Sequence, residues 1–214
     1  MEETPPGDGI LVRRKLGIEA DAPVVLLYSR FFEFSQERLH RLFADIYRRV
    51  NGVRFLVVGT GRHGEEELLV AAAGQQGFRS ALTMVGWVEP QDISDYLAAA
   101  DVAVYPLDDT LVNRSKCPAK LTEIIRAGIP VIVDRVGQAT EYVNEEVSGS
   151  LSDPTTVESM VDKIVVLLQN KTMSKSLGEK GRRYLLEQFS WHDYTERLYL
   201  FYMNCLHRKE GLDE

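Results

Sequence analysis

The apolar residues of this chain fall into short runs separated by amphipathic stretches, a pattern that predicts strands alternating with helices. Continuous apolar runs of strand length are typical of strands buried on both faces of a parallel sheet. They lie at residues 23–29, 53–59, 81–85, 101–106, 129–134 and, as a short edge strand, 148–151. Between them apolar residues recur every three or four positions, which indicates helices, as in the stripe that follows Ser35: Leu39, Leu42, Phe43 and Ile46.

This order of elements predicts the fold class and the division of the chain. Alternating strands and helices indicate an α/β, doubly wound, Rossmann-like parallel sheet of about six strands with helices on both faces. Further helices without a strand are expected after residue 155. Residues 1–8 are acidic and contain two prolines and a glycine, so we expect a linker or an added start there. Residues 9–208 would then form one domain, with a tail at 209–214.

Composition and charge narrow the functional classes. The net charge of −7 argues against general binding to nucleic acid or to an anionic membrane. No apolar run approaches the roughly 20 residues that a membrane-spanning helix needs. The two cysteines, Cys117 and Cys205, and the lack of a secretory signal favour a cytoplasmic location. The cysteines and the four histidines show no metal-ligand spacing, so we expect no metal site.

The richest candidate chemistry lies in residues 113–133, where a basic loop precedes a short helix and a β-branched strand. Pro118 suits the first helical position, where its missing N–H costs nothing. The backbone N–H groups that follow it would then point out of the helix start and, with the helix dipole, would favour an anion. These are the N–H groups of Ala119, Lys120 and Leu121.

Two side chains of the same helix extend this hypothesis. Lys120 and Glu123 are three residues apart and so share one face, which places a cation near a phosphate and a carboxylate one turn deeper, where ribose hydroxyls could donate to it. Arg114 and Lys116 add positive charge just before the helix. The pattern favours a phosphate-and-ribose site; the alternative is an ordinary amphipathic helix whose charged residues are solvated.

Other candidate ligand contacts stand at the carboxyl ends of the predicted strands, where open α/β sheets bind ligands. Arg30 follows the first strand directly, and a surface salt bridge is its alternative role. Trp87 and Val88 follow the third strand and could frame a nucleobase, although Trp87 could equally be a packing residue.

Residues 59–64 read G-x-G-x-x-G between a strand and a helix, which indicates a dinucleotide-binding loop. Three features argue against that interpretation. Glu65, Glu66 and Glu67 open the helix and would repel a pyrophosphate, the loop follows the second strand, and no acidic residue closes the next one. We therefore favour a tight glycine turn, with Gly61 near a ligand.

Taken together, these motifs resemble the C-terminal, donor-binding half of GT-B glycosyltransferases of the glycosyl transferases group 1 family (family 4). The resemblance covers nearly the whole chain and includes the glycine turn at Gly137. Its motifs are YSR at 28–30, VVGTG at 57–61, VGWV at 85–88, AADVAVYP at 99–106, PAKLTEIIRAGIPVI at 118–132 and FSW at 189–191. The run at 118–132 is the most specific of them.

The resemblance implies a binding site for a nucleoside-diphosphate sugar, with roles for particular residues. Arg30 matches the arginine that contacts the donor diphosphate, and the backbone of Trp87 and Val88 matches the turn against the base. Glu123 matches the second glutamate of the family's E-x7-E motif, which holds the ribose. Lys120 matches a lysine found in one branch of the family.

The sequence departs from the family pattern at two places. The first glutamate of E-x7-E, which normally touches the donor sugar, falls at Ser115. The lysine usually found a few residues after the arginine is missing, since residues 34–36 read FSQ. Arg114, Lys116 or Lys120 could supply the diphosphate charge that this second departure removes.

The resemblance also implies an enzyme of which this chain is one half. We expect transfer of a hexose from a nucleoside-diphosphate sugar, with retained anomeric configuration, no further cofactor and no catalytic residue readable here. The N-terminal acceptor domain would lie outside this chain, so the domain alone should be inactive or nearly so. Two alternatives remain open: a non-catalytic nucleotide-sugar-binding or scaffolding module, suggested by Ser115, and a nucleotide-binding oxidoreductase domain, suggested by residues 59–64.

Overall fold

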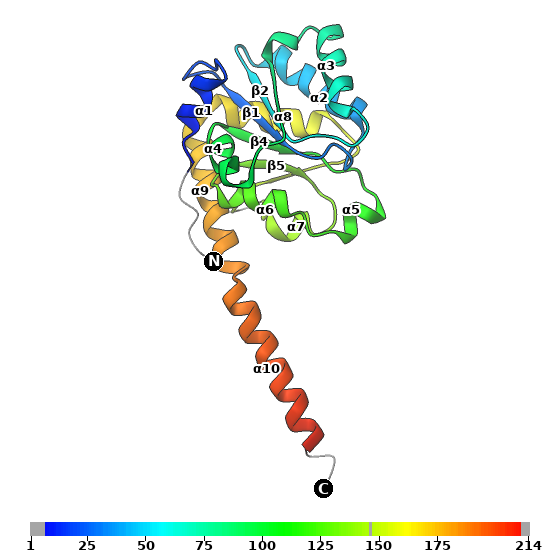
Figure 1. The fold of residues 1–214 in the computed structure, drawn as a ribbon, viewed down its shortest axis with the longest axis vertical. Coiled ribbons are helices and arrows are strands. Elements are labelled where there is room, and N and C mark those ends of the chain that lie inside the picture. The colour runs from blue at the N-terminus through cyan, green and yellow to red at the C-terminus, as the bar shows by residue number, and fades with distance from the viewer. Residues whose placement is uncertain (1–6, 146, 211–214) are drawn as a thin grey trace.

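A parallel sheet of six strands forms the centre of the computed structural model, which describes residues 7–145 and 147–210 (Figure 1). Its strands are β1 (Val24–Tyr28), β2 (Arg54–Val58), β3 (Leu82–Gly86), β4 (Val102–Tyr105), β5 (Val131–Asp134) and β6 (Ser150–Ser152). They lie in the order β3-β2-β1-β4-β5-β6, so the order reverses between β1 and β4. Ligands of doubly wound sheets bind beyond the carboxyl ends of the strands at such a reversal, which here lies beside Tyr28 and Tyr105.

Helices cover both faces of the sheet, as the sequence predicts (Figure 1). One face carries α2 (Gln36–Arg49), α3 (Glu65–Gln75) and α8 (Glu158–Gln169). The other carries α1 (Gly9–Lys15), α4 (Ile93–Ala98), α6 (Ala119–Arg126), α7 (Ala139–Tyr142) and α9 (Lys171–Gln188). Alternate residues of β1 serve the two cores, Val25 and Leu27 the first and Val24 and Leu26 the second. Covering both faces explains why the strand runs are almost wholly apolar.

Helix α2 confirms the local reasoning about caps and stripes. Ser35 is its N-cap, and its side chain accepts a hydrogen bond from the N–H of Arg38. The whole predicted stripe is buried, and Phe43 stacks on Phe55 of β2 with 4.3 Å between ring centroids. The short η1 (Arg79–Ala81) and η2 (Pro90–Asp92) helices precede β3 and α4.

Two predicted details around residues 107–118 are wrong. The expected loop contains a short helix, α5 (Leu111–Ser115), which begins because the Thr110 side chain accepts a hydrogen bond from the N–H of Asn113. We predicted Pro118 as the first helical residue of α6. It is instead the N-cap, the position before the helix, and its ψ of 80° lies outside the helical region. The first helical residue is therefore Ala119.

The last helix, α10 (Trp191–Glu210), extends away from the sheet (Figure 1). It begins just after α9 and carries exposed aromatic and aliphatic side chains: Trp191, Tyr194, Leu198, Tyr199, Leu200, Phe201, Tyr202 and Leu206. The expected end of the domain at residue 208 falls inside this helix, and the boundary stays a prediction. The expected linker at residues 1–8 and the tail at 209–214 lie largely outside the described residues.

Candidate functional site

A cavity of about 770 Å³ lies beyond the carboxyl ends of β1, β2 and β3, beside the reversal of strand order. Residues 28–30, 58–62, 87, 88, 90 and 91 supply one part of its wall, while α4, α6 and α9 supply most of the rest. Of the residues predicted from sequence, the structure brings six together here: Arg30, Gly61, Trp87, Val88, Lys120 and Glu123. Trp87 is 65% exposed and lines the opening, so it is not a core packing residue.

Two predicted cations lie elsewhere, paired with carboxylates of neighbouring loops. The Arg114 guanidinium donates through Nε and Nη2 to the two carboxylate oxygens of Asp109, at 2.5 and 2.6 Å. Lys116 Nζ lies 3.2 Å from Glu33 Oε1, and that carboxylate also accepts a hydrogen bond from Ser29 Oγ. Sequence reasoning identified the positive charges but not their carboxylate partners, of which Asp109 is five residues from Arg114 and Glu33 is far from Lys116 in the sequence.

The start of α6 offers less to an anion than its sequence predicts. The N–H of Ala119 donates to the carbonyl oxygen of Cys117 at 3.0 Å, and the N–H of Leu121 donates to that of Pro118, also at 3.0 Å. The Leu121 side chain is fully buried in the core. Two of the three N–H groups that we expected to be free are thus used in local hydrogen bonds within the turn at the start of the helix.

Positive charge nevertheless dominates the cavity. Among the described residues that line it, only Glu123 is acidic, whereas five are basic: Arg30, Arg62, Lys120, Arg126 and Arg182. The whole chain carries a net charge of −7, so this excess of cations is a local feature. A concave site lined by one sign of charge concentrates ligands of the opposite sign, which here means a ligand with more than one negative charge.

Lys120, Glu123 and Tyr28 form a compact group in the wall of the cavity. Lys120 Nζ lies 4.0 Å from the centroid of the Tyr28 ring, within cation–π range. Burial lowers the pKa of the Lys120 ammonium, Glu123 counteracts this, and Arg30 lowers it further. Burial also raises the pKa of Tyr28, as do the charge of Glu123 and the hydrogen bond between the two side chains. Tyr28 is therefore a neutral phenol that fixes the Glu123 carboxylate.

The glycine-rich loop holds a carboxylate of its own chain at the start of α3. Glu65 Oε2 accepts a hydrogen bond from the N–H of His63 at 2.7 Å, and backbone hydrogen bonds to His63 and to its own N–H lower the pKa of Glu65. A Cβ at Gly61 would overlap this carboxylate. The place where a dinucleotide-binding loop would hold pyrophosphate is thus filled, which favours the tight-turn interpretation of residues 59–64.

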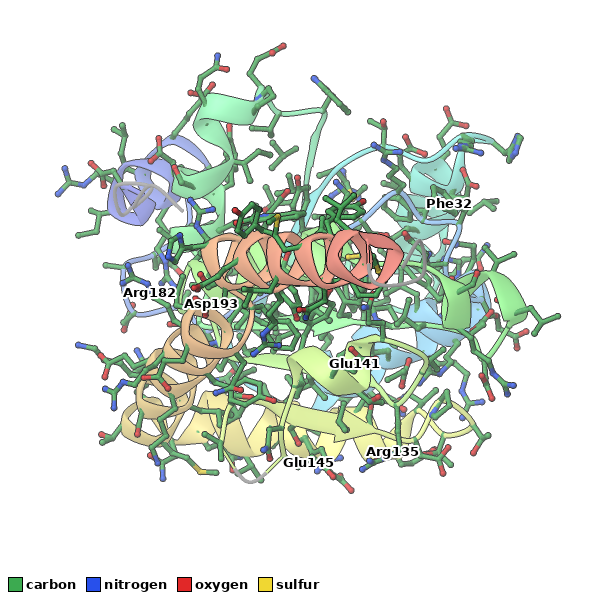
Figure 2. All side chains as sticks on the ribbon, turned by 90° about the horizontal axis from the view of Figure 1, so that it is seen from below. Phe32, Arg135, Glu141, Glu145, Arg182 and Asp193 are labelled. Atoms are coloured by element: carbon green, nitrogen blue, oxygen red, sulfur yellow. The ribbon has the colours of Figure 1, made fainter. Side chains whose placement is uncertain are left out.

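Sequence reasoning missed three basic residues of the cavity. Arg62 stands inside the G-x-G-x-x-G pattern, and Arg126 lies one helical turn after Glu123, so both positions held a local signal. Arg182 comes from α9, far along the chain, and nothing near it in the sequence indicates the site. Figure 2 shows Arg182 and Phe32 on opposite sides of the molecule, with α10 between them in this view.

Ser115, where the family's first glutamate would fall, forms only a local contact. Its hydroxyl donates to the carbonyl oxygen of Val112 at 3.1 Å, and the residue is exposed. Elsewhere in the described ranges, no cluster of three or more His, Cys, Asp or Glu side chains is arranged to hold a metal ion. Within those ranges, too, every helix is too short or too polar to span a membrane.

Comparison with known proteins agrees with this arrangement. The model of the family described as glycosyl transferases group 1 matches residues 10–184. A GDP-mannose-dependent alpha-(1-6)-phosphatidylinositol monomannoside mannosyltransferase of Mycobacterium tuberculosis is 27% identical over 189 residues, 87% of this chain and 48% of that protein. A D-inositol 3-phosphate glycosyltransferase of Segniliparus rotundus is 27% identical over 204 residues, 94% of this chain and 44% of its own. The chain thus spans about half the length of the curated relatives it matches.

Solved structures share the fold. Anabaena HepE in complex with UDP and glucose superposes with a TM-score of 0.79 at 20% identity, covering 94% of this chain and 53% of that one. A glycosyltransferase from Rickettsia africae superposes with a TM-score of 0.76 at 17% identity, covering 92% of this chain and 52% of that one. The sheet and its flanking helices are one Rossmann-like half of the GT-B fold.

Proposed function

The chain belongs to the glycosyl transferases group 1 family, and we propose that it is the part of such an enzyme that binds a nucleoside-diphosphate sugar. One observation carries this proposal: a cavity beside the reversal of strand order, rich in cations, in which Glu123 is the acidic residue among those described. A diphosphate supplies the negative charge that the cations match, and a ribose supplies hydroxyls that can donate to the carboxylate. Relatives support the ligand class, since HepE structures contain UDP or UDP-glucose.

In this proposal each part of the ligand meets a different wall. The diphosphate lies between Arg30 and Lys120, and the ribose lies against Glu123, whose carboxylate Tyr28 holds in place. The base lies against the turn of Trp87 and Val88. The mannosyltransferase relative is named for GDP-mannose and the HepE structures for UDP, so both nucleotides belong in the first test.

The proposed reaction is transfer of a hexose with retained anomeric configuration. Negative charge grows on the diphosphate as the bond to the sugar breaks, and fixed cations stabilise a developing charge more strongly than they stabilise the ground state. Arg30 and Lys120 would serve that role. The acceptor would bind to a second domain, in keeping with the half-length match to the relatives, and we place the enzyme in the cytoplasm. Alone, the chain should transfer little or no sugar.

A non-catalytic binding module is the second candidate function, and Ser115 favours it. An exposed serine there cannot replace a carboxylate that contacts the donor sugar. The two functions share the nucleotide site but differ in turnover. Tight binding of a nucleotide sugar without transfer by a polypeptide that also contains the acceptor domain would favour the non-catalytic module.

Calorimetric titration of the 214-residue chain with UDP, GDP, ADP and NAD tests the binding proposal. We expect one nucleoside diphosphate to bind, and we expect Glu123→Ala and Lys120→Ala each to weaken it at least ~10-fold, which equals ~1.4 kcal/mol. Arg114→Gln is the matched control, because Arg114 is a nearby cation that does not line the cavity and should leave the affinity unchanged. Binding of NAD without affinity for any nucleoside diphosphate would instead favour the oxidoreductase alternative.

A further inference from the structure

The cavity contains an arginine, Arg62, whose guanidinium is held by an aromatic ring from another loop. Arg62 follows β2 and lines the cavity, and its guanidinium carbon lies 4.7 Å from the centroid of the Phe32 ring. The Phe32 ring belongs to the loop after β1, two residues beyond Arg30. Stacking on an aromatic face restricts a long, flexible side chain while leaving its N–H donors free for other partners.

The backbone beside Phe32 is strained in a way that presents this ring. Phe31 has a φ of 68°, which bulky residues rarely adopt, and its side chain is fully buried. Two hydrogen bonds hold it there: Ser29 Oγ accepts from the Phe31 N–H at 2.9 Å, and Gln36 Nε2 donates to the Phe31 carbonyl oxygen at 2.5 Å. This turn directs Phe31 inward and leaves Phe32 44% exposed, where its ring contacts Arg62.

The Phe32 ring also contacts Lys116, which differs from Arg62 because a carboxylate pairs with it. Lys116 Nζ lies 5.4 Å from the centroid of the Phe32 ring, but Glu33, the next residue after Phe32, forms an ion pair with it. The ring therefore joins three loops, those after β1 and β2 and that before α6. Of the two cations that it contacts, Arg62 is the one that lines the cavity.

Resting on the proposed function, we propose that Arg62 is a diphosphate-binding residue and that Phe32 is its positioning residue. Arg62 would add to the charge of Arg30 and Lys120, because the other groups expected to meet the diphosphate do not serve it: residues 34–36 offer no lysine, Arg114 and Lys116 are paired with carboxylates, and the start of α6 uses two of its N–H groups. A guanidinium can donate two parallel hydrogen bonds to phosphate oxygens. Arg62 and Arg30 would approach the diphosphate from the loops of two adjacent strands, with Lys120 on the helix side.

Arg62→Gln and Arg62→Lys test the first part of the proposal, by calorimetry with the nucleoside diphosphate that the unsubstituted chain binds and with the matching monophosphate. We expect Arg62→Gln to weaken the diphosphate at least ~10-fold and the monophosphate less, because the contact scales with phosphate charge. Arg62→Lys should recover part of the loss, since it keeps the charge but not the fork of donors. Arg114→Gln, which should bind like the unsubstituted chain, controls for a general loss of positive charge.

A double-mutant cycle tests the role of Phe32. Phe32→Leu should weaken the diphosphate severalfold, Phe32→Tyr should restore it because the ring is kept, and Phe32→Leu should change nothing further once Arg62 is glutamine. A ring with a merely structural role would weaken binding equally in both backgrounds, and that result would overturn the positioning role. Unchanged diphosphate affinity in Arg62→Gln would overturn the inference alone. Absence of nucleoside-diphosphate binding by the unsubstituted chain would overturn the proposed function and the inference together.

Discussion

Two charged groups lie at the carboxyl edge of the same sheet, and they differ in how their charges are matched. At the end of β5 the Asp134 carboxylate is fully buried and accepts hydrogen bonds from Arg38 at 2.5 and 2.8 Å, from the N–H of Leu107 at 2.8 Å and from Ser152 Oγ at 2.8 Å. Beyond β1 and β2 the cavity gathers five basic residues around Glu123. The charge of the first group is paired within the chain, while the cavity has an excess of positive charge.

The difference separates a structural ion pair from the proposed binding site. Removing charge from water is costly, and the chain meets that cost at Asp134 with a two-pronged arginine and two further donors. In the cavity Arg30, Arg62 and Arg182 are exposed, and burial lowers the pKa of the Lys120 ammonium. Position at the sheet edge is shared by both groups, so position alone would not have told them apart.

Breaking the ion pair between Asp134 and Arg38 should have the largest effect on the stability of the chain. Asp134→Asn keeps the shape of the side chain but removes the counter-charge of Arg38, whose side chain is only 13% exposed. We expect the free energy of unfolding to fall by about 3–5 kcal/mol, the usual cost of leaving a buried charge unpaired. Urea denaturation, followed by circular dichroism, measures it. A loss below about 1 kcal/mol would mean that Arg38 finds water or its carbonyl contacts at Asp153 and Thr156 sufficient.

The cavity should respond to pH through its binding affinity. Burial lowers the pKa of Lys120, and an anionic ligand favours the protonated lysine, so the pKa of Lys120 should be higher in the complex than in the free chain. Affinity for the nucleoside diphosphate should therefore be constant at lower pH and fall, about 10-fold over the transition, as pH rises through the lowered pKa of the free chain. This fall should begin below the ordinary lysine value of about 10.4.

Calorimetry between about pH 7 and about pH 10 checks this dependence. Lys120→Arg supplies the control, because a guanidinium stays charged throughout this range and should flatten the fall while retaining binding. Proton uptake should accompany binding in the same range, and two buffers with different ionisation enthalpies would reveal it. An identical fall in Lys120→Arg would show that another group of the cavity titrates.

The sequence predicts those parts of the molecule that depend on neighbours along the chain. Short apolar runs predict the strands, and apolar residues spaced three or four apart predict the buried stripe of α2 after its cap at Ser35. The structure confirms both predictions. Helix α5 was missed because its cap, Thr110, stands in a polar segment that also reads as a loop. Two N–H groups at the start of α6, those of Ala119 and Leu121, form local hydrogen bonds that no pattern in the sequence indicates.

The composition of the cavity was only half predictable, because charge pairing is a property of the fold. Arg38 and Asp134 lie 96 residues apart, and no periodicity links them. Arg182 reaches the cavity only because α9 packs beside α6. Sequence reasoning could therefore name Arg30, Lys120 and Glu123 as candidates at strand and helix ends. It could not say that Arg62 would line the cavity while Arg114 would be neutralised elsewhere.

The smallest effect is expected at the exposed pair of Asp109 and Arg114. Both side chains are about half exposed, at 43% and 55%, so water and salt screen their attraction. Arg114 lowers the pKa of the Asp109 carboxyl through a hydrogen bond and its charge. Asp109→Asn removes that carboxylate, yet it should leave the urea midpoint within experimental error, unlike Asp134→Asn. The nucleoside-diphosphate affinity should also stay unchanged, because Arg114 does not line the cavity. Tighter diphosphate binding in Asp109→Asn would show that Arg114, once released from Asp109, can reach the ligand.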